Sequence, residues 1–146
     1  MKLKNINAEI VKAYHKTNAR FLIGKYDSDK FIISYDGVVA YIIASDDFIF
    51  NTTKLLRGDS FVDRLSLTVD NASVKAEEVT LTDNLKIQDK RELVELKNDT
   101  VSVWINRKLL NNFEPTRFYC KSPKSPVVVY EGEDIAGIIL PVRIQN

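Results

Sequence analysis

The last third of the chain, residues 101–144, constrains the fold most, because strand, helix and turn signals follow one another there in a recognisable order. Residues 101–105 alternate and are rich in β-branched and aromatic side chains, which predicts a half-buried strand. Asn106 can cap a short helix over residues 107–113, and Pro115 follows soon enough to end it. Turn residues then separate three further predicted strands, at residues 117–121, 127–130 and 136–144.

The first part of the chain predicts a helix followed by a meander. Ile6, Ile10, Val11 and Tyr14 recur at helical spacing, so we expect an amphipathic helix over residues 7–17, capped by Asn5 or Asn7. Three strands are predicted next, at residues 21–26, 31–35 and 38–43, with Asp36-Gly37 as the hairpin turn. Because the meander is apolar on both faces in places, we expect a neighbour, such as a second subunit, to cover one of them.

The middle of the chain predicts shorter elements. A helical turn can follow Asn51, over residues 51–56. Alternation with Leu65, Leu67 and Val69 inward predicts a strand over residues 61–69, and Asp70-Asn71 is then a turn. Other strands are predicted at residues 48–50, 74–81, 85–87 and 92–96.

Length and composition limit the kinds of fold that this chain can adopt. A chain of 146 residues, 45% hydrophobic and 28% charged, predicts a single globular domain over residues 1–146. We therefore expect an α+β fold, with two helices packed on antiparallel β-sheets. The single cysteine, Cys120, cannot form an internal disulfide, and no apolar segment opens the chain, so we expect a cytoplasmic protein with no membrane partner.

Five segments in a fixed order resemble the last domain of the bacterial sliding clamp, the β subunit of DNA polymerase III. These segments are Val103-Trp104-Ile105-Asn106, Leu109-Leu110, Ser125-Pro126-Val127-Val128, Glu131-Gly132-Glu133-Asp134 and Leu140-Pro141-Val142-Arg143. Upstream, residues 30–41 form a strand, an Asp-Gly turn and a second strand, which is similar to the clamp pattern. Clamps usually continue Asp-Gly with His-Arg-Leu, whereas Val38 and Val39 stand at the first two of these positions here.

The resemblance implies two kinds of contact. Clamp helices line the hole of a ring and present cations to the DNA backbone, so the DNA-contact candidates are Lys12, Lys16, Arg107 and Lys108. Clamps also bind partner peptides in a pocket, for which the candidates are Gly37, Val38, Val39, Ala40, Leu140, Pro141, Val142 and Arg143.

Size and charge shape the expected partners. A clamp ring contains six similar domains in two chains, whereas this chain has one, so either several copies form a homo-oligomer or the fold serves another use. A single-domain relative would suit a phage or prophage gene. Residues 1–30 hold seven Lys and Arg against three acids, a bias that favours a polyanion such as double-stranded DNA.

Catalytic signals are few. His15 is the only histidine, the five glycines are scattered, and the acidic clusters lie at predicted turns or on charged strands. We therefore expect a non-catalytic protein without a metal or cofactor. Three functions remain open: a clamp-like protein of DNA replication or its control, an adaptor or inhibitor that does not bind DNA, and a carboxylate-dependent hydrolase.

Overall fold

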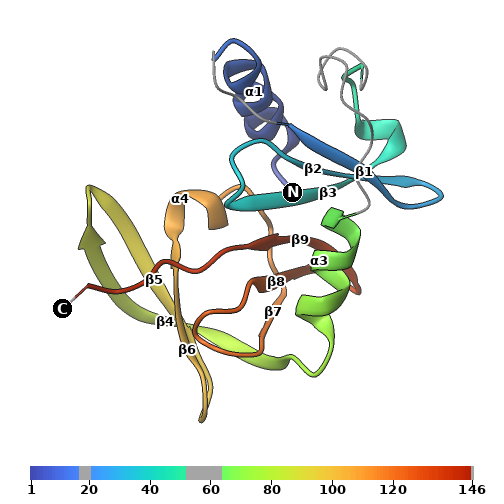
Figure 1. Cartoon of the computed structure of the whole chain (residues 1–146). Helices are drawn as coiled ribbons and strands as arrows, with labels where there is room; N and C mark the ends of the chain where they lie inside the picture. The colour runs from blue at the N-terminus through green and yellow to red at the C-terminus, as the bar shows by residue number, and fades with distance from the viewer. Residues whose placement is uncertain (17–20, 52–63, 146) are drawn as a thin grey trace.

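A computed structural model describes residues 1–16, 21–51 and 64–145 of the chain (Figure 1). The described strands join in one antiparallel hydrogen-bonded order, β1-β2-β3-β9-β8-β7-β4-β5-β6. Their bounds are β1 Leu22–Asp27, β2 Lys30–Ser34, β3 Val39–Ala44, β4 Glu77–Gln88, β5 Arg91–Lys97, β6 Ser102–Asn106, β7 Arg117–Cys120, β8 Val127–Glu131 and β9 Asp134–Ile139. The helices are α1 (Leu3–Tyr14), the short 3-10 helix η1 (Ser45–Asp47), α3 (Arg64–Ser73) and α4 (Arg107–Leu110). Helices and an antiparallel sheet make this an α+β fold in which strands predominate.

The two ends of the chain meet in the middle of the sheet. The predicted meander is confirmed as β1, β2 and β3, and the predicted strands before and after the Ser-Pro turn are confirmed as β7 and β8. β9 pairs with β8 on one side and with β3 on the other, where Val39 lies opposite Ile139. This pairing joins the first three strands to the last three.

α3 replaces a predicted strand. The prediction for residues 61–69 is wrong from Arg64 onward, and Asp70-Asn71 lies inside the helix instead of at a turn. Leu65, Val69 and Ala72 are buried at helical spacing, while Leu67 is exposed. The apolar pattern fits both periods, and packing against the sheet selects the helix. The structure therefore contains α3 in addition to the two helices that the sequence predicted.

β4 is one long strand where two were predicted, at 74–81 and 85–87. Leu81 lies opposite Leu96 and Leu85 lies opposite Val94, so β4 advances four residues where β5 advances two. The extra residues form a bulge that keeps the strand continuous. Residues 48–50, which were predicted as a strand, lie outside the sheet after η1, and the helical turn predicted at 51–56 lies, apart from Asn51, outside the described residues.

The helix ends also differ from prediction. α1 begins at Leu3, not Asn7, and ends at Tyr14, three residues before the predicted end, and no side chain caps its N-terminus. Its first turn is held instead by a tertiary contact, because the Lys2 amide donates to the Asn112 carbonyl at 2.9 Å. The last helix, α4, ends at Leu110 and is capped by Asn106 as predicted, since the Asn106 side chain accepts from the Lys108 amide at 3.0 Å.

Buried side chains form two clusters on opposite faces of the central strands. The larger one gathers Ile6 and Ile10 of α1 with Tyr41 of β3 and with apolar residues of β5, β6 and α4. The smaller one packs Leu65, Val69 and Ala72 of α3 on Ile42 and Val128. α3 therefore covers the second face of the meander, for which the sequence suggested another subunit.

The chain leaves the sheet before its end. β9 stops at Ile139, so the strand predicted to continue to Ile144 is five residues too long. Residues 140–145 run past β6, where the Val142 amide donates to the Trp104 carbonyl at 2.8 Å. Among the helices of the described ranges, none is long and apolar enough to cross a membrane.

Candidate functional site

Hydrogen bonds connect α1 to the segment just after α4. Besides the Lys2 contact, the Asn112 side chain just after α4 donates to both carboxylate oxygens of Glu9 on α1, at 3.3 and 3.2 Å. The same amide group donates to the Tyr41 hydroxyl at 2.8 Å. A buried asparagine thus connects both helices to β3, and the two helices that carry the DNA-contact candidates share one face.

Three of the four candidate cations line a single surface hollow of about 580 Å³. Lys12 lies on α1 and Lys16 lies two residues past its end, both are exposed, and Lys108 lines the same hollow from α4. The rest of the lining comes from Glu9, Ala13, Tyr35, Asp36, Asn106 and Leu109. The sequence candidates on different helices are therefore brought together.

The fourth candidate, Arg107, lines an adjoining hollow of about 330 Å³ that shares Asn106 and Lys108 with the first. Its guanidinium Nη1 lies 2.6 Å from Glu92 Oε1, so part of its charge is already paired. Lys90 and Arg91, at the turn between β4 and β5, line the same hollow. These two cations extend the charged face beyond the sequence candidates.

Glu9 is one of two acidic residues that line the larger hollow, and hydrogen bonds hold it. The Tyr35 hydroxyl donates to Glu9, in addition to the two contacts from Asn112. Burial, followed by the hydrogen bond to Glu9, raises the pKa of Tyr35 above its ordinary value, and burial raises the pKa of Tyr41 to about 12. Both phenols therefore stay protonated near neutral pH, where Tyr35 donates to Glu9 and the Tyr41 oxygen accepts from Asn112.

The eight partner-pocket candidates fall into two groups. Leu140 follows β9, and its amide donates to the Val38 carbonyl at 2.8 Å, so the two segments touch. Val39 and Ala40, however, are buried strand residues, and Gly37 forms the turn with a positive φ of 76°. None of residues 37–40 lines the hollow to which the end of the chain contributes.

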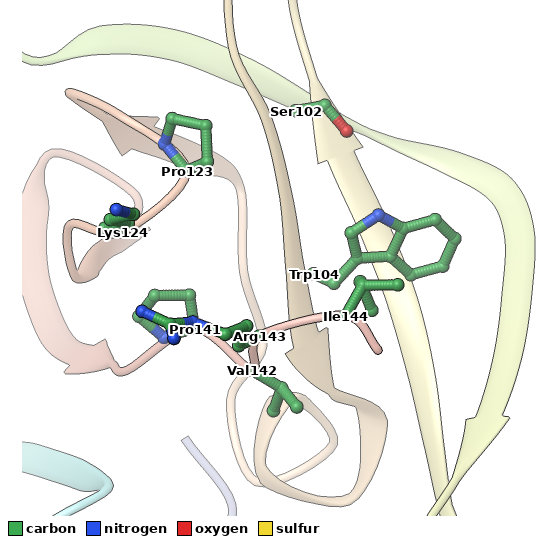
Figure 2. Close-up of a pocket in the computed structure, with 8 residues that line it drawn as sticks. All are labelled: Ser102, Trp104, Pro123, Lys124, Pro141, Val142, Arg143 and Ile144. Atoms are coloured by element: carbon green, nitrogen blue, oxygen red, sulfur yellow. The ribbon is translucent and has the colours of Figure 1, made fainter. Parts of the chain in front are cut away.

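That hollow, of about 460 Å³, lies between the end of the chain, β6 and the turn after β7 (Figure 2). It is lined by Ser102, Trp104, Pro123, Lys124, Pro141, Val142, Arg143 and Ile144. Figure 2 shows the Trp104 ring beside Ile144, with Pro123 and Lys124 across the hollow. The Lys86 ammonium lies 5.2 Å from the centre of the Trp104 ring. The lining thus combines apolar residues with Ser102 and two cations, Lys124 and Arg143.

Sequence reasoning missed Trp104, Lys124, Lys90 and Arg91 as site residues. Trp104 had a usable signal, because residues 101, 103 and 105 point inward in the predicted strand and leave a large aromatic ring on the other face. Lys90 and Arg91 follow Asp89 in a charged segment. Solvent-exposed turns often have such a sequence, so it gave no sign of a binding site. Only the folded chain shows that this turn lies near α4.

Other chemical groups are separate from these hollows. In the described part of the chain, no three His, Cys, Asp or Glu side chains are grouped so that they could hold a metal ion. His15 is exposed at the end of α1 against the Tyr14 ring. Cys120 is buried, and burial raises the pKa of its thiol, which disfavours the reactive thiolate.

Comparison with known proteins adds no relative to this picture: the chain matches no protein-family model, no curated protein and no solved structure.

Proposed function

We propose that this chain is a non-catalytic, clamp-like protein of DNA replication or its control, and that it binds the DNA backbone through the face shared by α1 and α4. The observation that supports the proposal is the position of Lys12, Lys16, Arg107 and Lys108, which line two adjoining hollows on neighbouring helices. Phosphates carry no sequence information, so a face of exposed cations is sufficient for this kind of binding.

The charge balance of the face is consistent with a polyanion. Six cations line the two hollows, and the acids on the same surface are Glu9, Asp36 and Glu92. The Glu9 carboxylate accepts hydrogen bonds from Tyr35 and Asn112, and Glu92 forms an ion pair with Arg107. Lys12, Lys16 and Lys108 are left exposed toward the hollow, at positions that a phosphate backbone could reach.

The test is the salt dependence of binding to a short DNA duplex, followed by fluorescence anisotropy. Affinity should fall steeply between about 50 and 200 mM salt, because each neutralised phosphate contributes about 0.9 to the slope of log affinity against log salt. Replacing Lys12, Lys16, Arg107 and Lys108 together by Gln should abolish binding at the higher salt concentration.

A matched variant controls for net charge. Lys25, Lys75, Lys97 and Lys121 are also exposed, and none of them lines either hollow. Changing these four to Gln removes the same charge and should leave the salt slope close to that of the unchanged chain. Full affinity in the first quadruple variant, or equal losses in both, would exclude the proposed face.

A second candidate function is an adaptor that binds a partner peptide beside Trp104 and does not bind DNA. The specific observation is the apolar hollow of Figure 2, which has Lys124 and Arg143 in its lining and Lys86 over the Trp104 ring. An apolar lining with cations around it fits an extended peptide that carries a large apolar side chain next to a carboxylate.

Trp104 is the only tryptophan, so its fluorescence reports on this hollow directly. An acidic, leucine-containing peptide should change the emission, and the same peptide with amides in place of its carboxylates should bind more weakly. Lys124→Gln with Arg143→Gln should remove this difference between the peptides. If both peptides leave the emission unchanged, the adaptor function through this hollow fails.

A further inference from the structure

β4 is paired along only part of one edge. Residues 77–79 pair with β7, whereas Thr80 to Gln88 pair only with β5 on the opposite edge. Within the described ranges, no other strand pairs with the outer edge of residues 80–88, which runs along the outside of the β4–β5 hairpin in Figure 1. An open edge presents a row of backbone N–H and C=O groups, and the group that completes such a row is another strand.

Three large aliphatic side chains stand along this segment. Leu81 is 51% exposed, Leu85 53% and Ile87 83%. Leu81 lies opposite Leu96 and Leu85 opposite Val94, and both partners on β5 are buried, so these β4 side chains lie on the core face of the sheet. We call Leu81, Leu85 and Ile87 the β4 stripe.

The open edge and the β4 stripe together are unusual for a surface strand. Proteins normally protect an exposed edge with a proline, a very short strand, a β-bulge or inward-pointing charges, and this segment has the bulge between Leu81 and Leu85. Residues 80–88 contain no proline, and their aliphatic side chains continue the core face of β5 past the point where the core ends. The segment thus has both the backbone groups and the apolar surface of an interface strand.

We propose that the outer edge of β4 pairs antiparallel with β4 of a second copy of this chain, so that a twofold axis joins two β4–β5–β6 units into one continuous sheet. A twofold contact uses the same surface on both copies, so the surface must be compatible with itself. Residues 80–88 carry one Asp and one Lys, so the edge is neutral and two copies do not repel each other.

One register avoids opposing like charges. If the axis passes through Asn84, Leu81 lies opposite the partner's Ile87, Leu85 opposite the partner's Asp83, and Lys86 opposite the partner's Thr82. The aliphatic side chains of Leu81 and Ile87 then face each other, and no two like charges are directly opposed. An axis through Lys86 would place two ammonium groups face to face, which is destabilising.

The test is the mass of the chain in solution, measured by light scattering after size exclusion over a range of concentrations. The expected mass is twice the 16.7 kDa of one chain. Leu85→Lys with Ile87→Lys places charges in the pairing strand and should return the chain to one copy. Leu67→Lys, on α3, is the control, because Leu67 is 58% exposed and should leave the dimer intact.

A second measurement needs no substitution. On dilution of the unchanged chain, amides of residues 80–88 should exchange with deuterium faster, while amides of the buried strand β8 should not change. A single-copy mass at every concentration overturns the proposal, and so does a trimer or larger assembly. A dimer that persists in the double lysine variant with an unchanged exchange rate at residues 80–88 also overturns it.

Discussion

Gly137 allows β9 to approach its neighbours closely. It lies opposite Tyr41 of β3, and a Cβ placed on it would be 2.2 Å from the Ala40 carbonyl oxygen and 2.9 Å from Phe113 Cζ. A backbone oxygen cannot move aside as the end of a side chain can. We predict that Gly137→Ala lowers the free energy of unfolding by about 2 to 3 kcal/mol, measured from the midpoint of urea unfolding.

Gly132 provides the comparison. It sits in the turn between β8 and β9 with φ +64°, and nothing lies within 4 Å of an added Cβ. Gly132→Ala should cost about 1 kcal/mol, because only the left-handed backbone conformation is penalised. Equal costs at the two glycines would show that the close approach at Gly137 relaxes without penalty.

Glu95 contributes a pH-dependent part of the stability. It is 8% exposed, and its carboxylate accepts hydrogen bonds from Ser102 on β6 and from Asn84 and Thr82 in the β4 bulge. The bonds from Ser102 and Asn84 lower the pKa of Glu95 below its ordinary value. A lowered folded-state pKa means that this stabilisation is complete above the unfolded value of about 4.3 and is lost as the pH falls through the folded value.

We therefore predict that Glu95→Gln destabilises the chain at neutral pH and that the difference shrinks as the pH falls below about 4. Urea unfolding of both chains across this pH range measures it. Glu78, an exposed glutamate on β4, gives a control variant, Glu78→Gln, with no such pH dependence expected. A difference that stays constant with pH would mean that the carboxylate charge is not what the three donors stabilise.

Some single residues were readable from the sequence and others were not. Asn106 follows a strand and precedes a helix-forming segment, so its cap was predictable. The need for glycine at position 137 was not, since it arises from Ala40 and Phe113, which are far away in the chain. The Asp36-Gly37 pair predicted a tight turn from the local sequence alone, and Gly37 has the positive φ that such a turn requires.

At the scale of elements, Asn112 connects α1, α4 and β3. It is 4% exposed, and its amide bonds to Tyr41 and Glu9. Asn112→Ala removes this donor, so the Glu9 carboxylate keeps the hydrogen bond from the Tyr35 hydroxyl and loses those from the amide. We predict a loss of about 1 to 3 kcal/mol in the free energy of unfolding, measured in urea.

Asn111, next in the chain, is the matched control because it is exposed. Asn111→Ala should change the unfolding free energy by no more than about 0.5 kcal/mol. If both variants behave alike, the buried amide does not hold the helices together.

The elements that were predicted correctly have a local signal. Buried and half-buried residues alternate in β7, and β8 begins with three consecutive valines. Turn residues flank both segments, so their sequences favour a strand over a helix. α3 was misread because Leu65, Leu67 and Val69 suit a strand as well as a helix, and only its packing on Ile42 and Val128 decides between them. Residues 140–144 are apolar except for Arg143, but residues 141–144 line the hollow beside Trp104 instead of continuing the sheet.

At the scale of the whole molecule, the charge of the face shared by α1 and α4 would set the strength of the DNA binding that we propose. Glu92 pairs with Arg107 at 2.6 Å, and both side chains are about half exposed, so the pair adds little stability. We predict that Glu92→Gln frees Arg107 and raises the affinity for duplex DNA about two- to fivefold, or by about 0.5 to 1 kcal/mol, in the anisotropy assay.

The same substitution at Glu78 makes the same change in net charge away from this face. Glu78→Gln should raise the affinity less than Glu92→Gln does, and the gap between them should narrow as salt screens long-range charge. Identical gains would mean that only net charge matters and that Arg107 is not at the binding surface.

The candidate site was only partly accessible from the sequence. Helical spacing placed Lys12 and Lys16 one turn apart, and resemblance to a clamp domain suggested that α4 lies beside α1. No local pattern indicated that the β4–β5 turn would bring Lys90 and Arg91 to the same surface, because that depends on how far β4 extends.

The pairing of β3 with β9 has a consequence for synthesis of the chain. Val39 cannot pair with Ile139 until about a hundred further residues have left the ribosome. The edge of β3 that pairs with β9 therefore emerges from the ribosome before its partner strand. Contacts between such distant residues also slow folding in general. In the nascent chain, one edge of the apolar strand β3 is therefore unpaired for part of synthesis. A chaperone that binds this edge should increase the yield of native protein.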